Sequence, residues 1–258
     1  MTSHLQSKIE SYCAAFDEHL QDLDAIAVPH RSRHFRKALC LSLLEALASG
    51  RFPSRGAKER FVKLVLRFGH WSQATHVSLV HLVKLLERLD DSAFDPARGT
   101  LYPKLQSAGS GGPVLIPEID LPWPEACAAW PVSPTAKLLG ETLSLDRLRL
   151  VELLYDYRNT LIHEARERTF SAENTEDEPF YESVGTSSDQ QEWHLVFPYD
   201  FLRKLVAACV TNLRADFLAT GRNPYAGHAF GYLMRPELND IVGRPVFYPC
   251  DLTDFEPL

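Results

Sequence analysis

Apolar residues recur at steps of three and four along most of the chain, and this spacing constrains the fold more than any other feature. Four segments in the first third of the chain have it: residues 4–26, 32–49, 56–68 and 73–89. Apolar side chains at this spacing lie on one face of an α-helix, and that face must pack against other elements. The sequence therefore predicts a bundle of helices.

The periodic pattern is lost between residues 91 and 142, where proline and glycine are frequent. Proline has no amide hydrogen to donate, and glycine does not favour helical backbone angles, so long helices are not expected there. The stretch also contains Trp123, Trp130 and several leucines, which are rare in disordered linkers. We therefore predict an ordered but irregular insertion, strapped across the helices.

The helical pattern returns over residues 144–168 and 199–219. Between these segments, "PFYESVG" and "EWHLVFP" flank "TSSDQQ", a pattern typical of a β-hairpin. The predicted fold is thus mainly α, a bundle of five to six helices with one small β-hairpin and the irregular insertion.

A chain of 258 residues can form one large domain, and we expect a single domain over residues 1–258. It would consist of N-terminal helices, the insertion, a segment with the next helix, the hairpin and the last helix, and a tail packed on the outside of the bundle. These parts are residues 1–90, 91–142, 143–220 and 221–258.

Charge and cysteine content exclude several classes of function. The net charge is −7, so any binding to nucleic acid requires a local basic patch. The five cysteines are scattered and form no CxxC pair, which favours a reducing cytoplasm and argues against a structural zinc site. No apolar run approaches the roughly 18 residues of a membrane span, and the start of the chain lacks the apolar core of a signal peptide. We expect a cytoplasmic protein without a metal or other cofactor and without a membrane partner.

Two basic regions could track an RNA backbone. The denser one carries Arg31, Arg33, Arg36 and Lys37, with Phe35 among them. A second region contains Arg51, Arg55, Lys58, Arg60, Lys63 and Arg67. Either region can bind phosphates, and either can instead be the solvated face of a helix.

The helix predicted after the insertion has an arginine on its apolar side. At 100° per residue, Val151, Leu154, Tyr155 and Ile162 lie in the same arc as Arg158. No acidic residue lies three or four positions from Arg158, so no ion pair within the helix can hold its guanidinium. A charge on the apolar side is costly alone. Arg158 therefore needs an anion or an acceptor from elsewhere.

A polar stripe runs beside this arc at spacings of four, three and four: Glu152, Asp156, Asn159 and His163. The helix thus brings Arg158, Asn159 and His163 to one edge. A neutral imidazole can take the proton from a ribose 2′-hydroxyl or give one to the leaving 5′-oxygen. A guanidinium can donate to phosphate oxygens, and an amide side chain can orient the histidine. None of these steps requires a metal.

The pattern R-N-x-x-x-H near the end of a buried helix resembles the R-x4-6-H motif of the HEPN superfamily. Its residues here are Arg158, Asn159 and His163. The helices before the motif, and the hairpin and closing helix after it, agree with the resemblance over roughly residues 30–220. Only the six-residue motif is specific.

The resemblance implies an α-helical domain that forms a homodimer, with two motifs facing each other across the interface. It also implies a metal-independent endoribonuclease, which leaves 2′,3′-cyclic phosphate and 5′-hydroxyl ends in a toxin or antiviral defence role. The expected partners are RNA, a second copy of the chain, and an antitoxin or other regulatory protein. HEPN toxins paired with a nucleotidyltransferase antitoxin carry a tyrosine two residues after the histidine. Ala165 occupies that position here, which argues against that pairing.

Two other interpretations stay open. Some HEPN proteins have lost catalysis, so the same helix could belong to a non-catalytic module that binds a nucleotide or a protein, or that serves dimerisation. Arg158 could also bridge to an acid on another helix, with His163 as an ordinary cation at the helix end. A second match to R-x4-6-H runs from Arg222 to His228, but it contains Pro224 and Gly227, which predict a turn.

Overall fold

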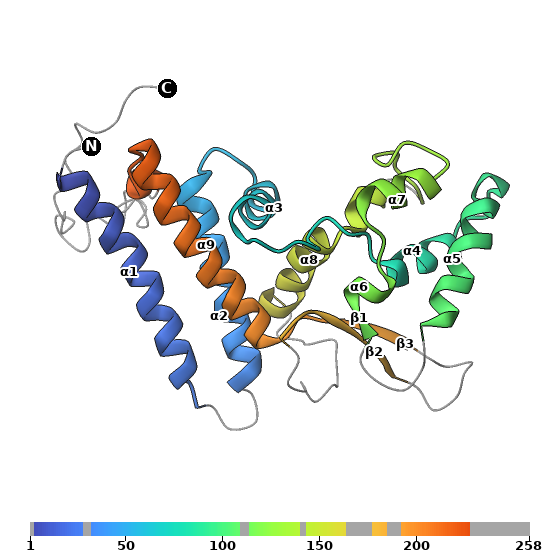
Figure 1. The fold of residues 1–258 in the computed structure, drawn as a ribbon, viewed down its shortest axis with the longest axis horizontal. Coiled ribbons are helices and arrows are strands. Elements are labelled where there is room, and N and C mark those ends of the chain that lie inside the picture. Colours follow the sequence, from blue (N-terminus) through green and yellow to red (C-terminus); the bar gives the residue numbers. More distant parts are fainter. Residues whose placement is uncertain are drawn as a thin grey trace, which may run out of the picture.

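The structure is a computed structural model that describes residues 3–27, 32–108, 114–139, 143–163, 177–184 and 192–227. Helices dominate it, so the chain is mainly α, as predicted. Its elements form two groups, with helix α8 (Leu150–His163) between them (Figure 1). None of the described helices is both long enough and apolar enough to cross a membrane.

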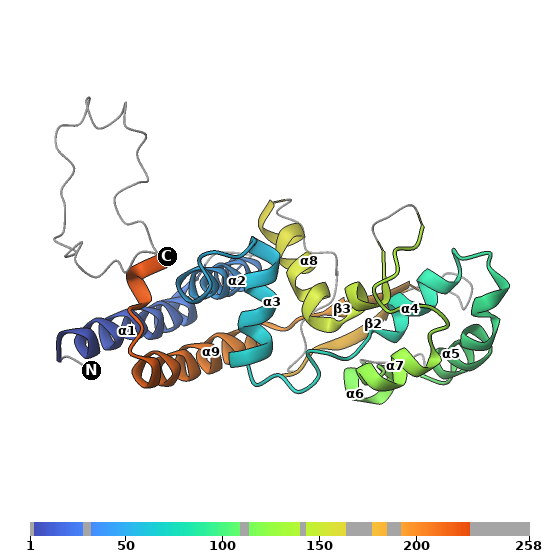
Figure 2. The same cartoon turned by 90° about the horizontal axis from the view of Figure 1, so that it is seen from above.

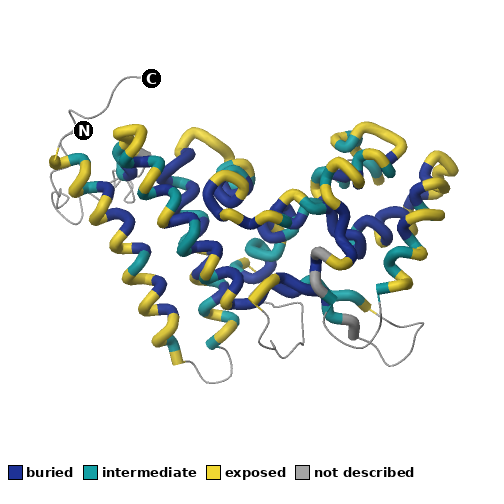
Figure 3. Tube along the Cα trace, viewed as in Figure 1, coloured by how far each residue is buried: buried dark blue, intermediate teal, exposed yellow. Residues whose placement is uncertain are grey.

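The first group consists of long helices that lie side by side. Helices α1 (Ser3–Ala25), α2 (Ser32–Arg51) and α9 (Tyr199–Thr220) form a layer, and α3 (Ala57–Phe68) packs on α2 and α9. Figure 3 shows buried and exposed positions alternating along each of these helices. The apolar stripe read from the sequence faces inward: α1 buries Ile9, Tyr12, Cys13, Phe16, Leu20 and Leu23.

The second group is built around a small antiparallel sheet in the order β1-β2-β3. The predicted hairpin is β2 (Phe180–Val184) with β3 (Glu192–Val196), and the two-residue strand β1 (Val114–Leu115) adds to its edge. The same group contains α4 (Leu79–Leu86), η1 (Ser92–Phe94), α5 (Asp95–Ser107), α6 (Ile116–Ile119) and α7 (Trp123–Ala129), with α5 packed on α4 and η1 (Figure 2).

The insertion over residues 91–142 is more regular than predicted, because it contains η1, α5, α6 and α7. Proline starts two of these helices: Pro96 and Pro124 occupy the first turns of α5 and α7, where a missing amide hydrogen costs no helical bond. The insertion is also not strapped across the long helices. It packs against α4 at the other end of the molecule (Figures 1 and 2).

Helix α8 connects the two groups. Its body packs on α2 and α3, and the short 3-10 helix η2 (Leu145–Leu148) precedes it. At its start, the amides of Leu150 and Val151 donate to the carbonyl oxygens of His76 and Ala74 at 2.9 and 3.0 Å. Ala74 and His76 lie in the segment before α4, and their carbonyl oxygens bind α8 instead of continuing a helix. Helix α4 therefore begins at Leu79 and not at the predicted residue 73. Helix α8 is therefore held along its body by α2 and α3 and at its start by the segment before α4.

The tail over residues 221–258 lies only partly within the described residues. Residues 224–227 form the 3-10 helix η4 (Pro224–Gly227), which packs on α1 and α2. The ring of Tyr225 lies 5.3 Å from that of Tyr12 in an edge-on contact. This first part of the tail covers the bundle as predicted, and residues 228–258 lie outside the described residues.

Candidate functional site

The three motif residues meet at the C-terminal end of α8. Arg158 Nη1 donates to Asn159 Oδ1 at 2.8 Å and lies 3.2 Å from His163 Nε2. An arginine has only donors, so Nε2 is the acceptor in the second contact and the imidazole proton is then on Nδ1. His163 is exposed, whereas Asn159 is half-buried and the Arg158 side chain is only 13% exposed. Solvent exposure in the cluster therefore increases from Arg158 through Asn159 to His163.

Arg158 has the acidic partner that its own helix lacks. Its Nη2 forms an ion pair with Glu45 Oε2 on α2, and Arg60 Nη2 of α3 donates to Glu45 Oε1 at 3.3 Å. The carboxylate side chain is 19% exposed, so this pair lies in partly desolvated surroundings. The interpretation of Arg158 as a bridge to an acid on another helix is therefore correct for its Nη2 atom. Nη1 remains directed to the motif.

Within the described part of the chain, one donor of Arg158 is unused. Its Nε atom is buried and has no hydrogen-bond partner among the described residues, while the guanidinium carbon lies 5.9 Å from the centre of the Tyr155 ring. A buried donor without a partner normally costs free energy. The guanidinium is thus held by Glu45 on one side and is incompletely satisfied on the other.

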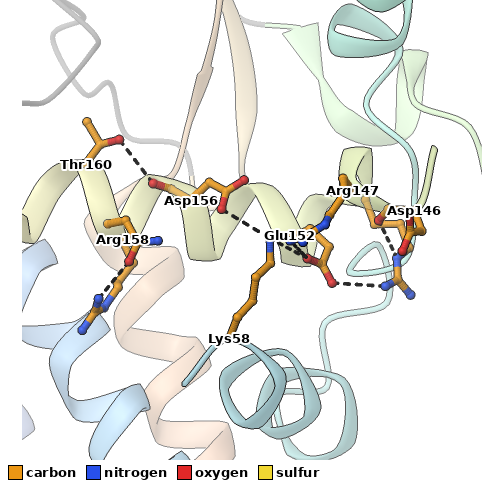
Figure 4. Close-up of polar contacts among 9 residues, drawn as sticks. Lys58, Asp146, Arg147, Glu152, Asp156, Arg158 and Thr160 are labelled. Atoms are coloured by element: carbon orange, nitrogen blue, oxygen red, sulfur yellow. Dashed lines mark hydrogen bonds and ion pairs between the residues drawn. The ribbon is translucent and has the colours of Figure 1, made fainter. Parts of the chain in front are cut away.

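The polar stripe of α8 continues from this cluster toward the start of the helix. Lys58 Nζ of α3 lies 2.8 Å from Glu152 Oε2 and 3.4 Å from Asp156 Oδ1. Glu152 is buried and also faces Arg149 at 3.2 Å and Arg147 at 3.7 Å. Figure 4 shows Lys58 rising from α3 to this stripe, while Arg158 leaves α8 in another direction. The stripe is thus lined by cations over its first half.

Two members of the first basic region, Arg36 and Lys37, are engaged by the fold. Lys37 is completely buried, on the helix face that also carries Leu41 and Leu44. Arg36 donates to the backbone oxygens of Asp24 and Ile26, at 2.9 and 2.7 Å, and so binds the end of α1. The buried Lys37 is therefore not accessible to a strand on the surface, and Arg36 has a structural contact that the sequence did not indicate.

The other two basic residues of that region are Arg31 and Arg33. Arg33 is exposed at the start of α2, and Arg31 lies outside the described residues. The second match to the motif is not on an α-helix: Arg222 follows the end of α9, and Pro224–Gly227 form a 3-10 turn. Its His228 also lies outside the described part of the chain. The setting of the motif at Arg158 is accordingly different from that of the second match.

A second polar cluster, which sequence reasoning missed, is buried beside the sheet. The hydroxyl of Tyr181 lies 2.8 Å from Asp120 Oδ2 and 2.7 Å from Ser78 Oγ, and the amide of Leu79 donates to Asp120 Oδ1 at 2.9 Å. Burial raises the pKa of the Asp120 carboxyl to about 7. No short motif marks this cluster, because its members come from segments up to 103 residues apart.

The described residues contain no group of three or more His, Cys, Asp or Glu side chains placed to hold a metal ion. The chain was also compared with protein-family models, with curated proteins and with solved structures, and none of them matches it.

Proposed function

We propose that the chain is a metal-independent endoribonuclease of HEPN type. The observation that carries this proposal is the exposed His163 imidazole, whose Nε2 lies 3.2 Å from Arg158 Nη1 at the C-terminal end of α8. An exposed imidazole beside a held guanidinium offers a proton acceptor and a cation at one point. These are the groups needed for attack of a ribose 2′-hydroxyl on the neighbouring phosphate.

In this proposal Arg158 Nη1 leaves His163 Nε2 and turns to the bound phosphate. The freed Nε2 takes the proton from the 2′-hydroxyl and returns one to the leaving 5′-oxygen. The oxygen–phosphorus bond to the 5′-oxygen breaks as the bond from the 2′-oxygen forms, which leaves a 2′,3′-cyclic phosphate. Arg158 Nη1 lies within 3.2 Å of both Asn159 and His163. A phosphate oxygen seated between those side chains would therefore also meet the guanidinium, which stabilises the added negative charge. Glu45 holds the guanidinium in this orientation.

We further propose a two-fold homodimer. One histidine and one arginine supply few groups to surround a phosphate, so a second copy of the motif would complete the site. Sedimentation at micromolar concentration should show a dimer, and a strictly monomeric protein with full ribonuclease activity would rule this part out. A cytoplasmic toxin or antiviral role, with an antitoxin or other regulatory protein as partner, would be compatible with such an activity.

The second candidate is a non-catalytic module that binds a nucleotide or a protein through the same helix. The Glu45 ion pair favours it, because much of the Arg158 charge is already balanced. Incubation of labelled RNA with the protein in EDTA, followed by end-group analysis, separates the two candidates. The ribonuclease should give 2′,3′-cyclic phosphate and 5′-hydroxyl ends. Binding without cleavage of varied RNAs would favour the module.

A further inference from the structure

A groove separates α3 from the segment formed by η2 and the start of α8. It has a volume of about 640 Å³. Its walls are Lys58, Glu59, Val62, Lys63, Leu66 and Arg67 on α3, with Asp146, Arg147, Arg149 and Glu152 opposite. It lies at the other end of α8 from His163, and none of its residues belongs to the motif.

The groove carries a net positive charge, whereas the whole protein carries a net negative charge. Five of its residues are lysine or arginine and three are aspartate or glutamate, which leaves an excess of two positive charges. The whole chain has a net charge of −7. A concave surface with the opposite sign to the rest of the protein concentrates the field and attracts anions to itself. This contrast points to an anionic ligand.

The cations of the groove are not equally engaged. Lys58 and Arg149 are held on Glu152 at 2.8 and 3.2 Å. Arg147 is 46% exposed, and its nearest carboxylate oxygen is 3.7 Å away, at Glu152. Lys63 has no carboxylate within 4.0 Å among the described residues and lies over the Phe52 ring. Arg147 and Lys63 therefore have the most capacity left for a ligand.

The groove also offers an apolar surface between its charges. Val62 is buried in its wall, and Leu66 is 41% exposed. Phosphates alone need no such surface, whereas the sugars and bases of a single strand pack on apolar and aromatic side chains while cations hold the backbone. The mixture of cations with an exposed leucine thus fits a nucleic-acid strand better than a small inorganic anion.

The polar stripe of α8 connects this groove with the motif. Glu152 lines the groove, and Asp156, Asn159 and His163 follow on the same side of the helix. From Glu152 to His163 the helix rises by about 16 Å. Lys58 reaches Asp156, so the cations extend one turn beyond the groove toward the motif. A chain bound in the groove could therefore continue along α8 to His163.

We infer that this groove binds the sugar-phosphate backbone of single-stranded RNA beside the cleaved phosphate. The inference rests on the proposed function for its choice of RNA, and it assigns the strand's path to α3 and the first half of α8. Lys63 and Arg147 contact phosphates, Lys58 and Arg149 are oriented by Glu152, and Leu66 contacts a sugar or a base. Asp156 lies beside the path and repels the strand.

The test measures affinity without cleavage. A short labelled oligoribonucleotide with 2′-O-methyl groups lacks the attacking hydroxyl, so binding to it is independent of catalysis. Lys63→Gln with Arg147→Gln should weaken binding at least about tenfold at low salt, and should reduce the slope of log K against log salt by about 0.7 for each cation. Asp156→Asn should tighten binding, while Glu152 still holds Lys58. The matched control is Lys84→Gln with Arg88→Gln, two exposed cations outside the groove.

Each outcome decides the inference. An unchanged affinity in the Lys63 and Arg147 variant, or an equal loss in the Lys84 and Arg88 control, would overturn it. Displacement of the oligonucleotide by polyglutamate at equal concentration would overturn it in favour of an acidic peptide. If the oligonucleotide binds as expected but unmodified RNA is never cleaved, the proposed ribonuclease function is wrong, and the inference that the groove binds RNA is kept. If RNA is cleaved and the groove variants bind normally, only the inference that the groove binds RNA is wrong.

Discussion

The end of α8 and the cluster of Ser78, Asp120 and Tyr181 are both groups of polar side chains in apolar surroundings. At the end of α8 the guanidinium is mostly buried, one of its donors has no partner among the residues that the structure describes, and the histidine is exposed. Beside the sheet, all three residues are buried, and the Tyr181 hydroxyl forms hydrogen bonds with both Ser78 and Asp120. The two clusters thus share their chemistry of donors and acceptors and differ in their access to solvent.

This difference separates the roles that the two clusters can have. A closed network with its hydrogen bonds made contributes to stability, because water and ligands cannot reach it. An open network with a spare donor and an exposed imidazole can exchange partners with a ligand at small cost. Changes in the α8 cluster should therefore alter activity, and changes in the buried cluster should alter stability.

The largest effect should come from His163→Ala. If the imidazole transfers the proton, the cleavage rate should fall by about 10²–10⁴-fold, and RNA affinity and melting temperature should change little because the residue is exposed. Single-turnover kinetics and binding to uncleavable RNA measure the two parts separately.

The histidine of the second motif match provides a control for this variant. His228→Ala should cleave like the wild type, because its arginine lies outside an α-helix. Loss of cleavage in His228→Ala with normal cleavage in His163→Ala would show that the motif at Arg158 is not the catalytic one.

The next largest effect concerns Arg158 and stability. An arginine held only for a ligand could be replaced by methionine without loss, whereas the pair with Glu45 predicts a loss. Arg158→Met should lower the free energy of unfolding by about 3 kcal/mol, the lower end for a broken buried pair, because Arg60 still faces Glu45.

A double-mutant cycle tests the same pair. Glu45→Met in the Arg158→Met background should recover part of the lost stability, since paired apolar residues replace buried ions well, while Arg60 loses its carboxylate. Urea denaturation measures all four proteins. Strictly additive effects of the two substitutions would show that the pair is not coupled.

Tyr181→Phe should have a smaller effect, and only on stability. It removes the hydroxyl that contacts Ser78 at 2.7 Å and Asp120 at 2.8 Å, and leaves buried polar atoms with fewer partners. The expected loss is about 1–3 kcal/mol in the free energy of unfolding. The cleavage rate per folded molecule should stay at the wild-type value, and a specific loss of rate would place this cluster in the active machinery.

The last prediction is a gradual pH dependence of stability, with no expected change in the cleavage chemistry. Burial raises the pKa of Asp120 from 3.8 to about 7. Between these values the folded chain keeps a proton that the unfolded chain has lost, so stability falls as pH rises, by up to about 1.4 kcal/mol per unit. Below that window the contribution is fully present.

Comparison with Asp120→Asn isolates this slope. The amide cannot ionise, so chemical denaturation from pH 4 to 7 should show a flatter profile for the variant. Burial lowers the pKa of His76, which makes stability rise with pH below about 6.5 in both proteins, and the difference between them removes this opposing effect. Identical profiles would contradict the raised pKa of Asp120.

The fold was predictable where local rules decide it. The long helices follow from apolar spacing, and the hairpin from two strand-like segments around a polar turn. The helices of the insertion were missed because proline was taken as a breaker, although Pro96 and Pro124 lie in first turns. Helix α4 was predicted too long, because pairing of Val77 with Leu121 cannot be read from local spacing.

The site was predictable only in part, for a similar reason. Helical geometry brought Arg158, Asn159 and His163 together, and the structure has them in one cluster. Glu45 could not be identified, because it lies 113 positions away in the chain and reaches Arg158 only through packing of α2 on α8. The burial of Lys37 did have a local signal, since Leu41 and Leu44 share its helix face.

Chemical rescue of His163→Ala tests the central claim most directly. The exposed end of α8 should admit free imidazole to the position of the lost side chain. We predict that this variant cleaves RNA slowly in EDTA, and that added imidazole raises its rate and gives the same 2′,3′-cyclic phosphate ends, above a control without protein. A His163→Ala protein that cleaves as fast as the wild type without imidazole would contradict the account.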